Sequence, residues 1–302
     1  MTTAAAITDF QRLLAQGRLV LDGGLATALE QAGHDLSGSL WSAALLADSP
    51  EEVLAVHRGY VAAGADIVST ASYQASRSGF ERAGRTAEQA DQVIVEAVSL
   101  ARESGARFVA ASIGPYGATL ADGSEYRGDY QVTRESLRRF HAERLEVVLS
   151  ASPDVLAFET VPSLMEVEVI YDLLSDEFTT LPAWLSVSAK DGEHLSDGTP
   201  LATLAAIAAP AALVALGVNC TKPEHISGCL QNLAGASVPR IVYPNAGRTW
   251  DAVARDWLDA GVDRLPTATL NEWFDLGASI IGGCCGLTYD HVADVRAVVD
   301  AQ

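Results

Sequence analysis

The chain has 302 residues, 49% of them hydrophobic, and a formal net charge of −19 with a sequence pI near 4.5. Such an acidic surface repels nucleic acids and anionic membranes, because both are bound through clustered lysines and arginines. The length allows one large domain or two small ones with a substantial core.

The four cysteines, at positions 220, 229, 284 and 285, are too few for a disulfide framework in a chain of this length. The segment from Met1 to Arg18 has no basic patch followed by an apolar core, and no apolar run reaches the ~20 residues that span a bilayer. We therefore expect no signal peptide and no membrane span. A reducing, cytoplasmic location is the resulting expectation, and it suits thiolate ligands.

Eight apolar, β-branched segments recur at intervals of about 25 to 50 residues, which leaves room for a crossover helix in each connection. Helices are expected over residues 50–63, 86–104, 133–150 and 288–299. Repeated β-then-α units with near-continuous apolar strands indicate parallel pairing, and eight of them predict a (β/α)8 barrel of the TIM type. An open doubly wound sheet is the alternative. The predicted strands are Leu19–Leu21, Ile67–Thr70, Phe108–Ile113, Val155–Phe158, Ala183–Val187, Leu213–Val218, Ile241–Tyr243 and Ser279–Ile281.

Polar or otherwise unusual residues follow six of these predicted strands. In a (β/α)8 barrel the catalytic residues lie where strands end and βα loops begin, so the fold would collect them on one face. They are Asp22-Gly23-Gly24, Thr70-Ala71-Ser72-Tyr73, Glu159-Thr160, Asn219-Cys220, Asn245 and Cys284-Cys285.

Three of the cysteines end apolar segments: Cys220 the sixth, and Cys284 and Cys285 the eighth. Neighbouring side chains in a strand point to opposite faces, but the flanking glycines allow both sulfurs to turn toward one ion. Three thiolates would bind Zn²⁺ and leave a fourth position open, which marks a catalytic site. Because metal coordination deprotonates a thiol, such a site suits alkyl transfer to a substrate sulfur. The alternatives are a closed four-ligand zinc site, buried cysteines without a metal, and a vicinal disulfide.

Two carboxylates at strand ends, Asp22 and Glu159, would be costly to bury unless a cation binds them. A substrate ammonium would satisfy both, and the alternative for Asp22 is a turn cap. Backbone N–H groups of Gly23 and Gly24 could approach a substrate carboxylate, and hydroxyl donors lie nearby. The further residues expected to bind substrate are Thr70, Ser72, Tyr73 and Asn219.

The third βα connection is long, from Gly114 to about Val132, and loops of this length in a compact domain are usually functional. Its three tyrosines and three carboxylates would suit a cationic ligand, although a well-packed surface loop is the alternative. Aromatic faces attract cations, so we expect Trp41, Tyr73 and Tyr126 to bind a sulfonium, unless Trp41 is a core residue. The loop residues are Tyr116, Asp122, Glu125, Tyr126, Asp129 and Tyr130.

Several of these segments together resemble the zinc-dependent homocysteine S-methyltransferases, from about Leu19 to Val299. The third loop and the segment His194–Pro200 are similar to the branch that uses S-methylmethionine, some members of which also accept S-adenosylmethionine. The segments that carry the resemblance are Leu21–Gly24, Thr70–Ala75, Phe158–Thr160, Gly217–Cys220 and Gly282–Cys285.

The resemblance implies methyl transfer from a sulfonium to L-homocysteine, giving methionine, in a single homocysteine-binding (β/α)8 barrel domain over residues 1–302. Because the chain ends soon after the eighth unit, we expect the cobalamin and folate modules of larger relatives to be absent, and a methylfolate donor is not expected. The implied ligands are Cys220, Cys284 and Cys285 for zinc and Asp22, Gly23, Thr70 and Glu159 for homocysteine.

Other functions remain open at this point. One is the same barrel with another donor, such as betaine, or with another thiol or selenol acceptor. The other is a non-catalytic zinc-binding barrel that acts as a sensor or interaction protein. Turnover with a panel of donors separates the first from the expected reaction, and tight zinc binding without turnover would favour the second.

Overall fold

The computed structural model describes residues 3–34, 45–46, 49–120, 122–178, 181–248, 250–251, 256–257 and 261–301. Eight parallel strands form one sheet in the order β1-β10-β7-β6-β5-β4-β3-β2. All eight predicted strands are confirmed, with bounds that shift by a few residues at most. The strands are β1 (Leu19–Val20), β2 (Ile67–Ser69), β3 (Phe108–Ile113), β4 (Val155–Val161), β5 (Ala183–Val187), β6 (Leu213–Asn219), β7 (Arg240–Tyr243) and β10 (Ala278–Ile281).

The two ends of this sheet meet, and the sheet is therefore a barrel. A parallel bridge joins Leu21 to Ile67 just beyond β1. The Asp22 N–H donates to the Ile67 carbonyl at 3.0 Å, and the Asp66 N–H donates to the Val20 carbonyl at 2.8 Å. The contact is short because β1 has two residues. The (β/α)8 barrel is confirmed, and the open doubly wound sheet is excluded.

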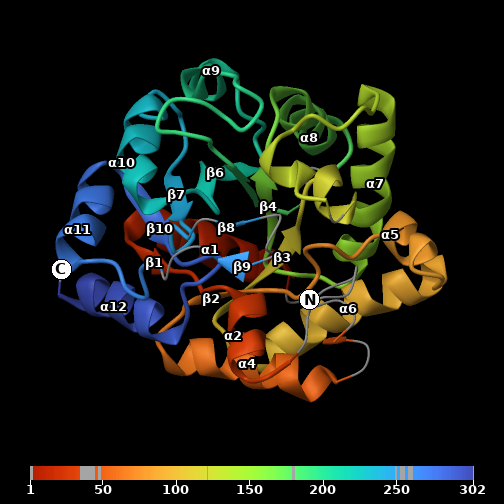
Figure 1. Cartoon of the computed structure of the whole chain (residues 1–302), viewed down its shortest axis with the longest axis horizontal. Helices are drawn as coiled ribbons and strands as arrows, with labels where there is room; N and C mark the ends of the chain where they lie inside the picture. The colour runs from red at the N-terminus through yellow and green to blue at the C-terminus, as the bar shows by residue number, and fades with distance from the viewer. Residues whose placement is uncertain are drawn as a thin grey trace.

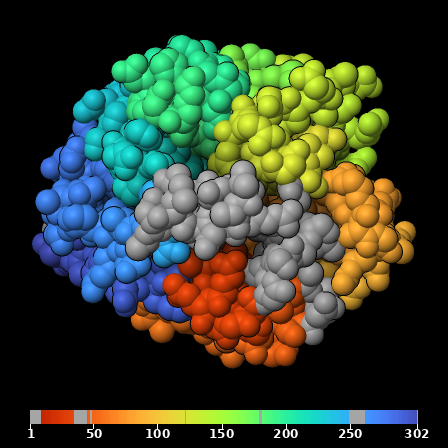
Figure 2. Space-filling view, viewed as in Figure 1, coloured from red at the N-terminus to blue at the C-terminus, as the bar shows by residue number. Residues whose placement is uncertain are grey.

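The helices cover the outside of the strands (Figure 1). In the space-filling view the colours follow one another around the rim, as expected when each βα unit packs beside the next (Figure 2). The described helices are α1 (Thr3–Gln16), α2 (Leu25–Gln31), α4 (Pro50–Ala62), α5 (Arg77–Arg82), α6 (Ala87–Glu103), α7 (Arg134–Ser150), α8 (Leu164–Asp176), α9 (Leu201–Ala206), α10 (Pro223–Asn232), α11 (Thr267–Asp275) and α12 (Tyr289–Asp300). Two short 3-10 segments, η1 (Tyr116–Leu120) and η2 (Ser124–Tyr126), lie in the third βα connection.

The four predicted helices are confirmed, and their starts have local causes. Thr86 and Gln89 form a capping box at the start of α6, in which each side chain bonds the other residue's backbone N–H. Thr133 accepts a hydrogen bond from the Ser136 N–H at the start of α7. Pro50 occupies the first turn of α4, where its missing N–H costs no hydrogen bond.

The core has two layers that follow the alternation of the strands. Residues such as Val20, Leu156 and Leu185 face outward and pack with the helices. The inward layer contains Leu19, Leu21, Ile67, Phe108, Ala110, Val155, Ala157, Trp184, Ala215, Ile241 and Ile280, together with Phe10 and Leu14 of α1. Because these strand residues lie mainly in the first halves of their strands, α1 closes the amino-terminal end of the barrel. The opposite end is left for the residues that follow the strands.

Two further findings concern elements outside the barrel. A short antiparallel ribbon, β8 (Trp250–Asp251) with β9 (Asp256–Trp257), was not predicted from the sequence. Two-residue strands carry too little alternation to be recognised. None of the described helices combines the length and the apolar character needed to cross a membrane.

Candidate metal centre and substrate site

The three cysteines predicted to share one ion converge at the carboxyl-terminal end of the barrel. Their sulfur atoms all lie within 4.8 Å of one another, and they are the one group of this kind among the described residues. The Cys220 and Cys285 sulfurs are 3.6 Å apart, and those of Cys284 and Cys285 are 4.0 Å apart. The spacing is too wide for a vicinal disulfide, and all the cysteines are free thiols.

The donor set fits a tetrahedral metal ion. Zinc binds thiolates at about 2.3 Å, so the edges of an ideal tetrahedron of sulfurs around it measure about 3.8 Å. The two measured separations, 3.6 and 4.0 Å, lie on either side of that length. No described His, Asp or Glu joins the cluster as a fourth ligand. Cys220, Cys284 and Cys285 can therefore hold a divalent ion with one position open.

Cys220 is placed by an unusual backbone conformation. It follows β6 with a φ of +45°, in the left-handed region that non-glycine residues seldom adopt. Two hydrogen bonds hold it there: its N–H donates to the Tyr243 carbonyl at 3.0 Å, and the Asn245 amide donates to its carbonyl at 2.9 Å. The left-handed turn redirects the thiol toward the end of β10. Asn245, noted in the sequence at a strand end, thus acts on the backbone of Cys220.

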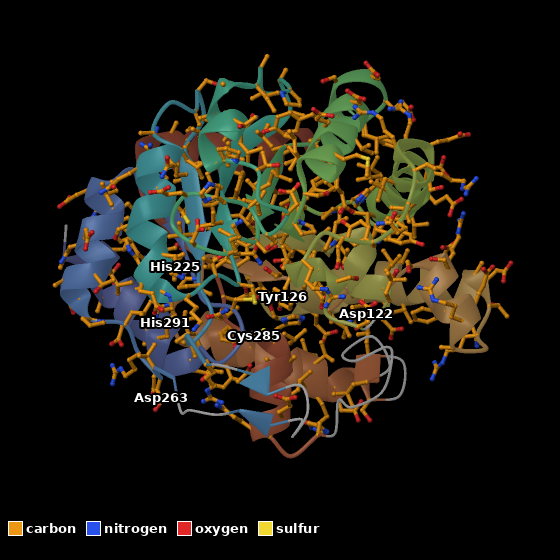
Figure 3. All side chains as sticks on the ribbon, turned by 45° about the horizontal axis from the view of Figure 1, so that its top comes forward. Asp122, Tyr126, His225, Asp263, Cys285 and His291 are labelled. Atoms are coloured by element: carbon orange, nitrogen blue, oxygen red, sulfur yellow. The ribbon has the colours of Figure 1, made fainter. Side chains whose placement is uncertain are left out.

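Cys284 and Cys285 lie in a tight turn after β10. The Cys284 N–H donates to the Pro244 carbonyl, and the Ala246 N–H donates to the Cys285 carbonyl, both at 2.8 Å. Gly286 follows with a φ of +84°, which a side chain would oppose. Because this turn is attached to the segment after β7, both neighbouring sulfurs can face Cys220. Figure 3 shows Cys285 beside Tyr126 at the centre of the molecule.

The charge on the cluster favours a bound cation. Hydrogen bonds from the Cys284 and Cys285 thiols lower the pKa of Cys220 well below its usual range, against the effect of burial. The contacts with Cys220 raise the pKa of Cys284 and of Cys285. Cys220 therefore loses its proton most readily, and its negative charge opposes the deprotonation of Cys284 and Cys285. A divalent cation would remove this repulsion, as expected of a metal site.

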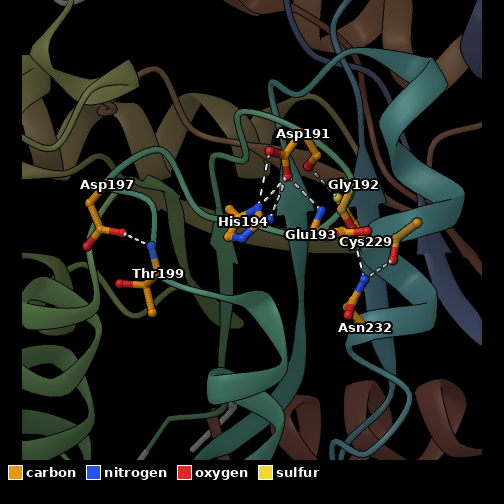
Figure 4. A network of polar contacts seen from close by, with 9 residues as sticks. Asp191, Gly192, Glu193, His194, Asp197, Thr199, Cys229 and Asn232 are labelled. Carbon is orange, nitrogen blue, oxygen red and sulfur yellow. Dashed lines mark hydrogen bonds and ion pairs between the residues drawn. The ribbon is translucent and has the colours of Figure 1, made fainter.

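Cys229 lies apart from the cluster, as expected for a structural thiol. Burial raises its pKa to about 12, and its sulfur donates to the Asp191 carbonyl at 3.5 Å. Figure 4 shows this contact in the connection after β5, where the Asp191 carboxylate also accepts the backbone N–H of His194 at 2.7 Å. Asn232 donates to the Gly192 carbonyl of the same turn at 3.1 Å. These contacts hold the loop on α10.

Two buried carboxylates lie near the cysteines. Asp22 accepts a hydrogen bond from the Ser69 N–H at 2.7 Å, and burial raises its pKa well above the usual range. Burial also raises the pKa of Glu159 to about 7, while hydrogen bonds from Ser112 and Tyr243 oppose the shift. Each also feels a neighbouring negative charge, Asp22 that of Glu159 and Glu159 that of Cys220. The arrangement would suit a cationic ligand between them, and the predicted binding of a substrate ammonium stays a prediction.

The hydroxyls of Thr70 and Ser72 are already engaged in the protein. Ser72 donates its hydroxyl proton to the Ser112 carbonyl at 2.8 Å. The Thr70 hydroxyl lies 2.7 Å from the Ser72 hydroxyl and is therefore the donor in that hydrogen bond. Thr70 in turn accepts the Ser112 N–H at 2.9 Å. Both hydroxyls lie just after β2, but the Thr70 proton is donated to Ser72 and the Ser72 proton to the Ser112 carbonyl of β3. Their predicted contact with substrate stays a prediction.

Gly23 and Gly24, which follow β1, were expected to bring their N–H groups close to a substrate carboxylate. The Gly24 N–H donates to the Leu287 carbonyl at 2.9 Å, so the expectation that it meets a substrate carboxylate is wrong for this structure. A Cβ on Gly23 would lie 2.6 Å from the same carbonyl, and a Cβ on Gly24 would lie 2.7 Å from the Cys284 carbonyl. Close approach of the cysteine turn therefore requires both glycines. Binding of substrate by Gly23 stays a prediction.

Asn219 uses its amide on a neighbouring strand end. Its Oδ1 accepts the Thr160 N–H at 2.7 Å, and its Nδ2 donates to the Thr160 hydroxyl at 2.8 Å. Thr160 has a φ of +60°, a strained conformation for a β-branched residue. The amide stabilises the residue that follows Glu159. Asn219 therefore positions the end of β4, and its predicted contact with substrate stays a prediction.

Two of the three aromatic residues predicted to bind the methyl donor lie in the described part of the structure. The Tyr126 hydroxyl lies 3.3 Å from the Cys220 sulfur, while the residue remains 44% exposed. Its ring therefore forms part of the wall between the cysteines and solvent. Tyr73 is partly buried, and burial followed by the charge of Glu125 raises its pKa. Trp41 lies outside the described residues.

Comparison with known proteins shows the family of this chain. A family model described as homocysteine S-methyltransferase matches residues 19–299. This chain belongs to the homocysteine S-methyltransferase family. It is 42% identical over 295 residues to homocysteine S-methyltransferase YbgG of Bacillus subtilis, covering 92% of this chain and 93% of that protein. It is 43% identical over 296 residues to homocysteine S-methyltransferase of Escherichia coli, covering 93% and 95%.

The fold of this member of the homocysteine S-methyltransferase family matches a solved relative. The metallated form of the homocysteine methyltransferase MmuM from Escherichia coli superposes with a TM-score of 0.82 at 41% identity, covering 93% of this chain and 96% of that chain. The resemblance stated from the sequence motifs is therefore confirmed.

Sequence reasoning missed several residues that shape the site of this homocysteine S-methyltransferase family member. Arg144 of α7 is buried, and its guanidinium donates to the carbonyls of Ser72, Tyr73 and Gly114 at 2.7 to 3.2 Å. It joins the ends of β2 and β3. A charged residue within a predicted helix reads as a surface residue, so no local signal reveals this role. Ser112 was also missed, because a serine inside a predicted strand gives no local sign that its hydroxyl bonds Glu159.

The third βα loop is fastened to α7 and α8 by a buried carboxylate. Glu166 accepts hydrogen bonds from the Tyr116 N–H at 2.8 Å and from the Tyr130 hydroxyl, and it lies 2.8 Å from the His141 Nε2. Burial raises the pKa of Glu166 to about 8 and lowers that of His141 to about 3, so both are neutral near pH 7. These contacts hold both ends of the segment that carries Tyr126.

Proposed function

We propose that this chain is an enzyme that transfers a methyl group from a sulfonium donor to the thiolate of L-homocysteine, giving methionine. The observation that carries the proposal is the convergence of three sulfurs within 4.8 Å beside the buried carboxylates of Asp22 and Glu159. Family membership supports the acceptor. The likeness of the third loop to the S-methylmethionine branch supports that donor, with S-adenosylmethionine as a second.

We infer that Cys220, Cys284 and Cys285 hold Zn²⁺. Bound there, Zn²⁺ supplies the positive charge that keeps a substrate thiol deprotonated near neutral pH. The sulfur spacing and the missing fourth protein ligand among the described residues support this assignment. The metallated form reported for the Escherichia coli relative is consistent with it.

The remaining residues bind and orient the acceptor. Asp22 and Glu159 receive the homocysteine ammonium, and a bound cation lowers the pKa that burial has raised in both carboxylates. Ser112 holds Glu159, and Asn219 holds the adjoining Thr160. Tyr126 covers the cysteines on the solvent side. Positioning of this kind supplies much of the rate of a displacement between two bound molecules.

The reaction balances without a protein base. The thiolate sulfur of homocysteine attacks the donor methyl carbon, forming a new carbon–sulfur bond. The bond between that carbon and the donor sulfonium breaks, and its electron pair stays on the donor sulfur. The donor leaves as a neutral thioether, which is methionine when S-methylmethionine is used. One positive and one negative charge are neutralised, so removal of water from the site strengthens the attraction between reactants.

The decisive experiment measures zinc per chain together with turnover of homocysteine by S-methylmethionine, S-adenosylmethionine and betaine. One zinc per chain and methionine formation with a sulfonium are the expected results. Turnover by a fully metal-free enzyme would contradict the zinc assignment, and turnover with betaine alone would contradict the sulfonium donor. Zinc binding without turnover of any donor would support a non-catalytic barrel. A single domain over residues 1–302 and a cytoplasmic location stay predictions.

A further inference from the structure

The third loop carries three carboxylates, and the structure separates one of them from the other two. Asp122 accepts the Ser124 N–H at 2.9 Å at the start of η2, and Asp129 is exposed and paired with Arg127. Glu125 is 3% exposed. A carboxylate that is buried within a surface loop is costly unless a partner neutralises it. Glu125 is therefore the residue of this loop that requires an explanation.

Glu125 has an incomplete set of partners. Its Oε2 is buried and has no hydrogen-bond partner among the described residues. The charge of Arg127 lowers the pKa of Glu125, but that guanidinium is half exposed and donates to Asp129 and to the Asp122 carbonyl. Buried charged groups are nearly always paired or bound to a ligand. The unpartnered oxygen therefore has an unused capacity to accept a hydrogen bond or to pair with a cation from outside the chain.

Glu125 lies close to the reaction site, next to Tyr126 in the chain. Its charge is the largest electrostatic influence on Tyr73, and the charge of Cys220 is the largest on Glu125. The adjacent Tyr126 brings its hydroxyl to 3.3 Å from the Cys220 sulfur. Ser188 donates to the Glu125 carbonyl at 3.1 Å, which fixes the backbone on the end of β5. Figure 3 shows Tyr126 at the cysteines and Asp122 farther out on the same loop.

Two positively charged groups enter the proposed reaction, the ammonium of homocysteine and the sulfonium of the donor. Asp22 and Glu159 are assigned to the homocysteine ammonium. We propose that Glu125 binds the positively charged methyl donor and makes the enzyme select cationic sulfonium donors over neutral methyl donors. This inference rests on the proposed function, and it adds a specificity residue to it.

The charge change during transfer determines which kinetic constant Glu125 controls. The donor sulfur is positively charged before the reaction and neutral after it, so its attraction to Glu125 falls as the carbon–sulfur bond breaks. Glu125 therefore stabilises bound donor more than the transition state or the thioether product. Removing its charge should raise the donor KM and leave kcat unchanged or higher.

The test compares wild type with Glu125→Gln, using S-methylmethionine as the cationic donor and methyl iodide as a neutral donor to homocysteine. The expected result is a rise in the S-methylmethionine KM of at least about 30-fold, the lower end of the effect of removing one member of a buried charge pair. The enzymatic rate with methyl iodide, after subtraction of the uncatalysed reaction, should stay within about twofold. The homocysteine KM and the zinc content should not change.

Two further variants serve as controls for the Glu125→Gln result. Glu168→Gln makes the same chemical change at an exposed residue of α8 that pairs with Arg134, and it should leave both donors unaffected. Glu125→Asp keeps the charge on a shorter side chain and should give a donor KM between those of wild type and Glu125→Gln.

Each contrary outcome has one meaning. If wild type turns over S-methylmethionine and Glu125→Gln has the same donor KM, the inference about Glu125 is wrong while the proposed function stands. Equal losses with both donors, or loss of zinc, would show a structural role and also overturn the inference. If wild type turns over no sulfonium, the proposed function itself fails.

Discussion

At the scale of single residues, the site depends on two strand ends held in the left-handed region. Thr160 and Cys220 have φ values of +60° and +45°, and such strain costs of the order of 1 to 3 kcal/mol at each residue. Asn219 bonds both the N–H and the hydroxyl of Thr160, and Asn245 bonds the carbonyl of Cys220. Two amides at neighbouring strand ends thus stabilise the backbone conformation that positions Glu159 and Cys220.

Replacing Asn219 by alanine should therefore affect both stability and activity. The loss of two buried hydrogen bonds predicts a decrease of about 2 kcal/mol in the free energy of unfolding, measured by urea titration. Turnover of homocysteine should fall at least tenfold, because Thr160 is free to leave its strained conformation.

Asn232→Ala is a matched control for Asn219→Ala. The Asn232 amide also makes two hydrogen bonds, to the carbonyls of Gly192 and Gly228, but away from the cysteines. It should lose comparable stability and retain turnover and zinc. Equal losses of activity in the two variants would contradict the positioning role of Asn219.

The cysteine assignment can be tested with a control inside the same molecule. Cys284→Ala should abolish zinc retention and turnover, because two sulfurs at 3.6 Å cannot complete the site. Cys229→Ala removes a buried thiol that bonds the Asp191 carbonyl and should keep zinc at the wild-type level. Zinc per chain after gel filtration is the measurement. Retention of zinc and activity by Cys284→Ala would refute the proposed centre.

At the scale of elements, the third βα loop is attached to two helices through Glu166 and His141. The pKa of Glu166 is raised by burial from 4.5 to about 8, and that of His141 is lowered by burial from 6.5 to about 3. From pH 4.5 to 6.5 the pair holds one proton in both the folded and the unfolded chain, so its effect on stability is constant. From pH 6.5 to 8 only the folded pair keeps this proton, and the free energy of unfolding falls as pH rises.

Glu166→Gln should remove this part of the pH dependence. Wild type should lose about 2 kcal/mol more stability than the variant between roughly pH 6.5 and 8. Urea unfolding of both proteins at the two pH values provides the comparison. Glu168→Gln, on the exposed face of the same helix, should keep the full wild-type decrease. Identical decreases in wild type and Glu166→Gln would show that the pair does not titrate as described.

At the scale of the whole molecule, the cysteine cluster connects strand ends that are distant along the chain. Cys220 follows β6, while Cys284 and Cys285 follow β10, and β7 lies between these strands in the sheet. A metal ion bound at the cluster would stabilise only the folded barrel, because the unfolded chain does not bring the three sulfurs together.

Chelation should therefore lower the thermal midpoint. With metal in excess of its dissociation constant by about a thousandfold, binding contributes about 4 kcal/mol, and its removal predicts a decrease in Tm of roughly 5 to 10 °C. Differential scanning calorimetry with and without chelator measures it. Cys284→Ala should show no decrease on chelation. A chelator effect of the same size in that variant would mean that the stabilising metal lies elsewhere.

The sequence alone was sufficient to predict the barrel and the convergence of the three cysteines. Eight apolar segments at crossover spacing, with Thr86 and Thr133 capping the helices between them, specify βα repetition through local periodicity. The cysteines were predictable because parallel strands end on one face of a barrel, whatever their separation along the chain.

The tertiary structure alone decided the hydrogen bonds and the burial of the polar groups around those cysteines. Thr70 donates its proton to Ser72, and Ser72 donates its own to the Ser112 carbonyl. The Gly24 N–H donates to the Leu287 carbonyl, and Glu125 is left with an unpartnered oxygen. No pattern in the sequence reveals these facts. A hydrogen bond or a buried charge depends on atoms brought together from strands and loops tens of residues apart, whereas helix and strand periodicity depends only on neighbours along the chain.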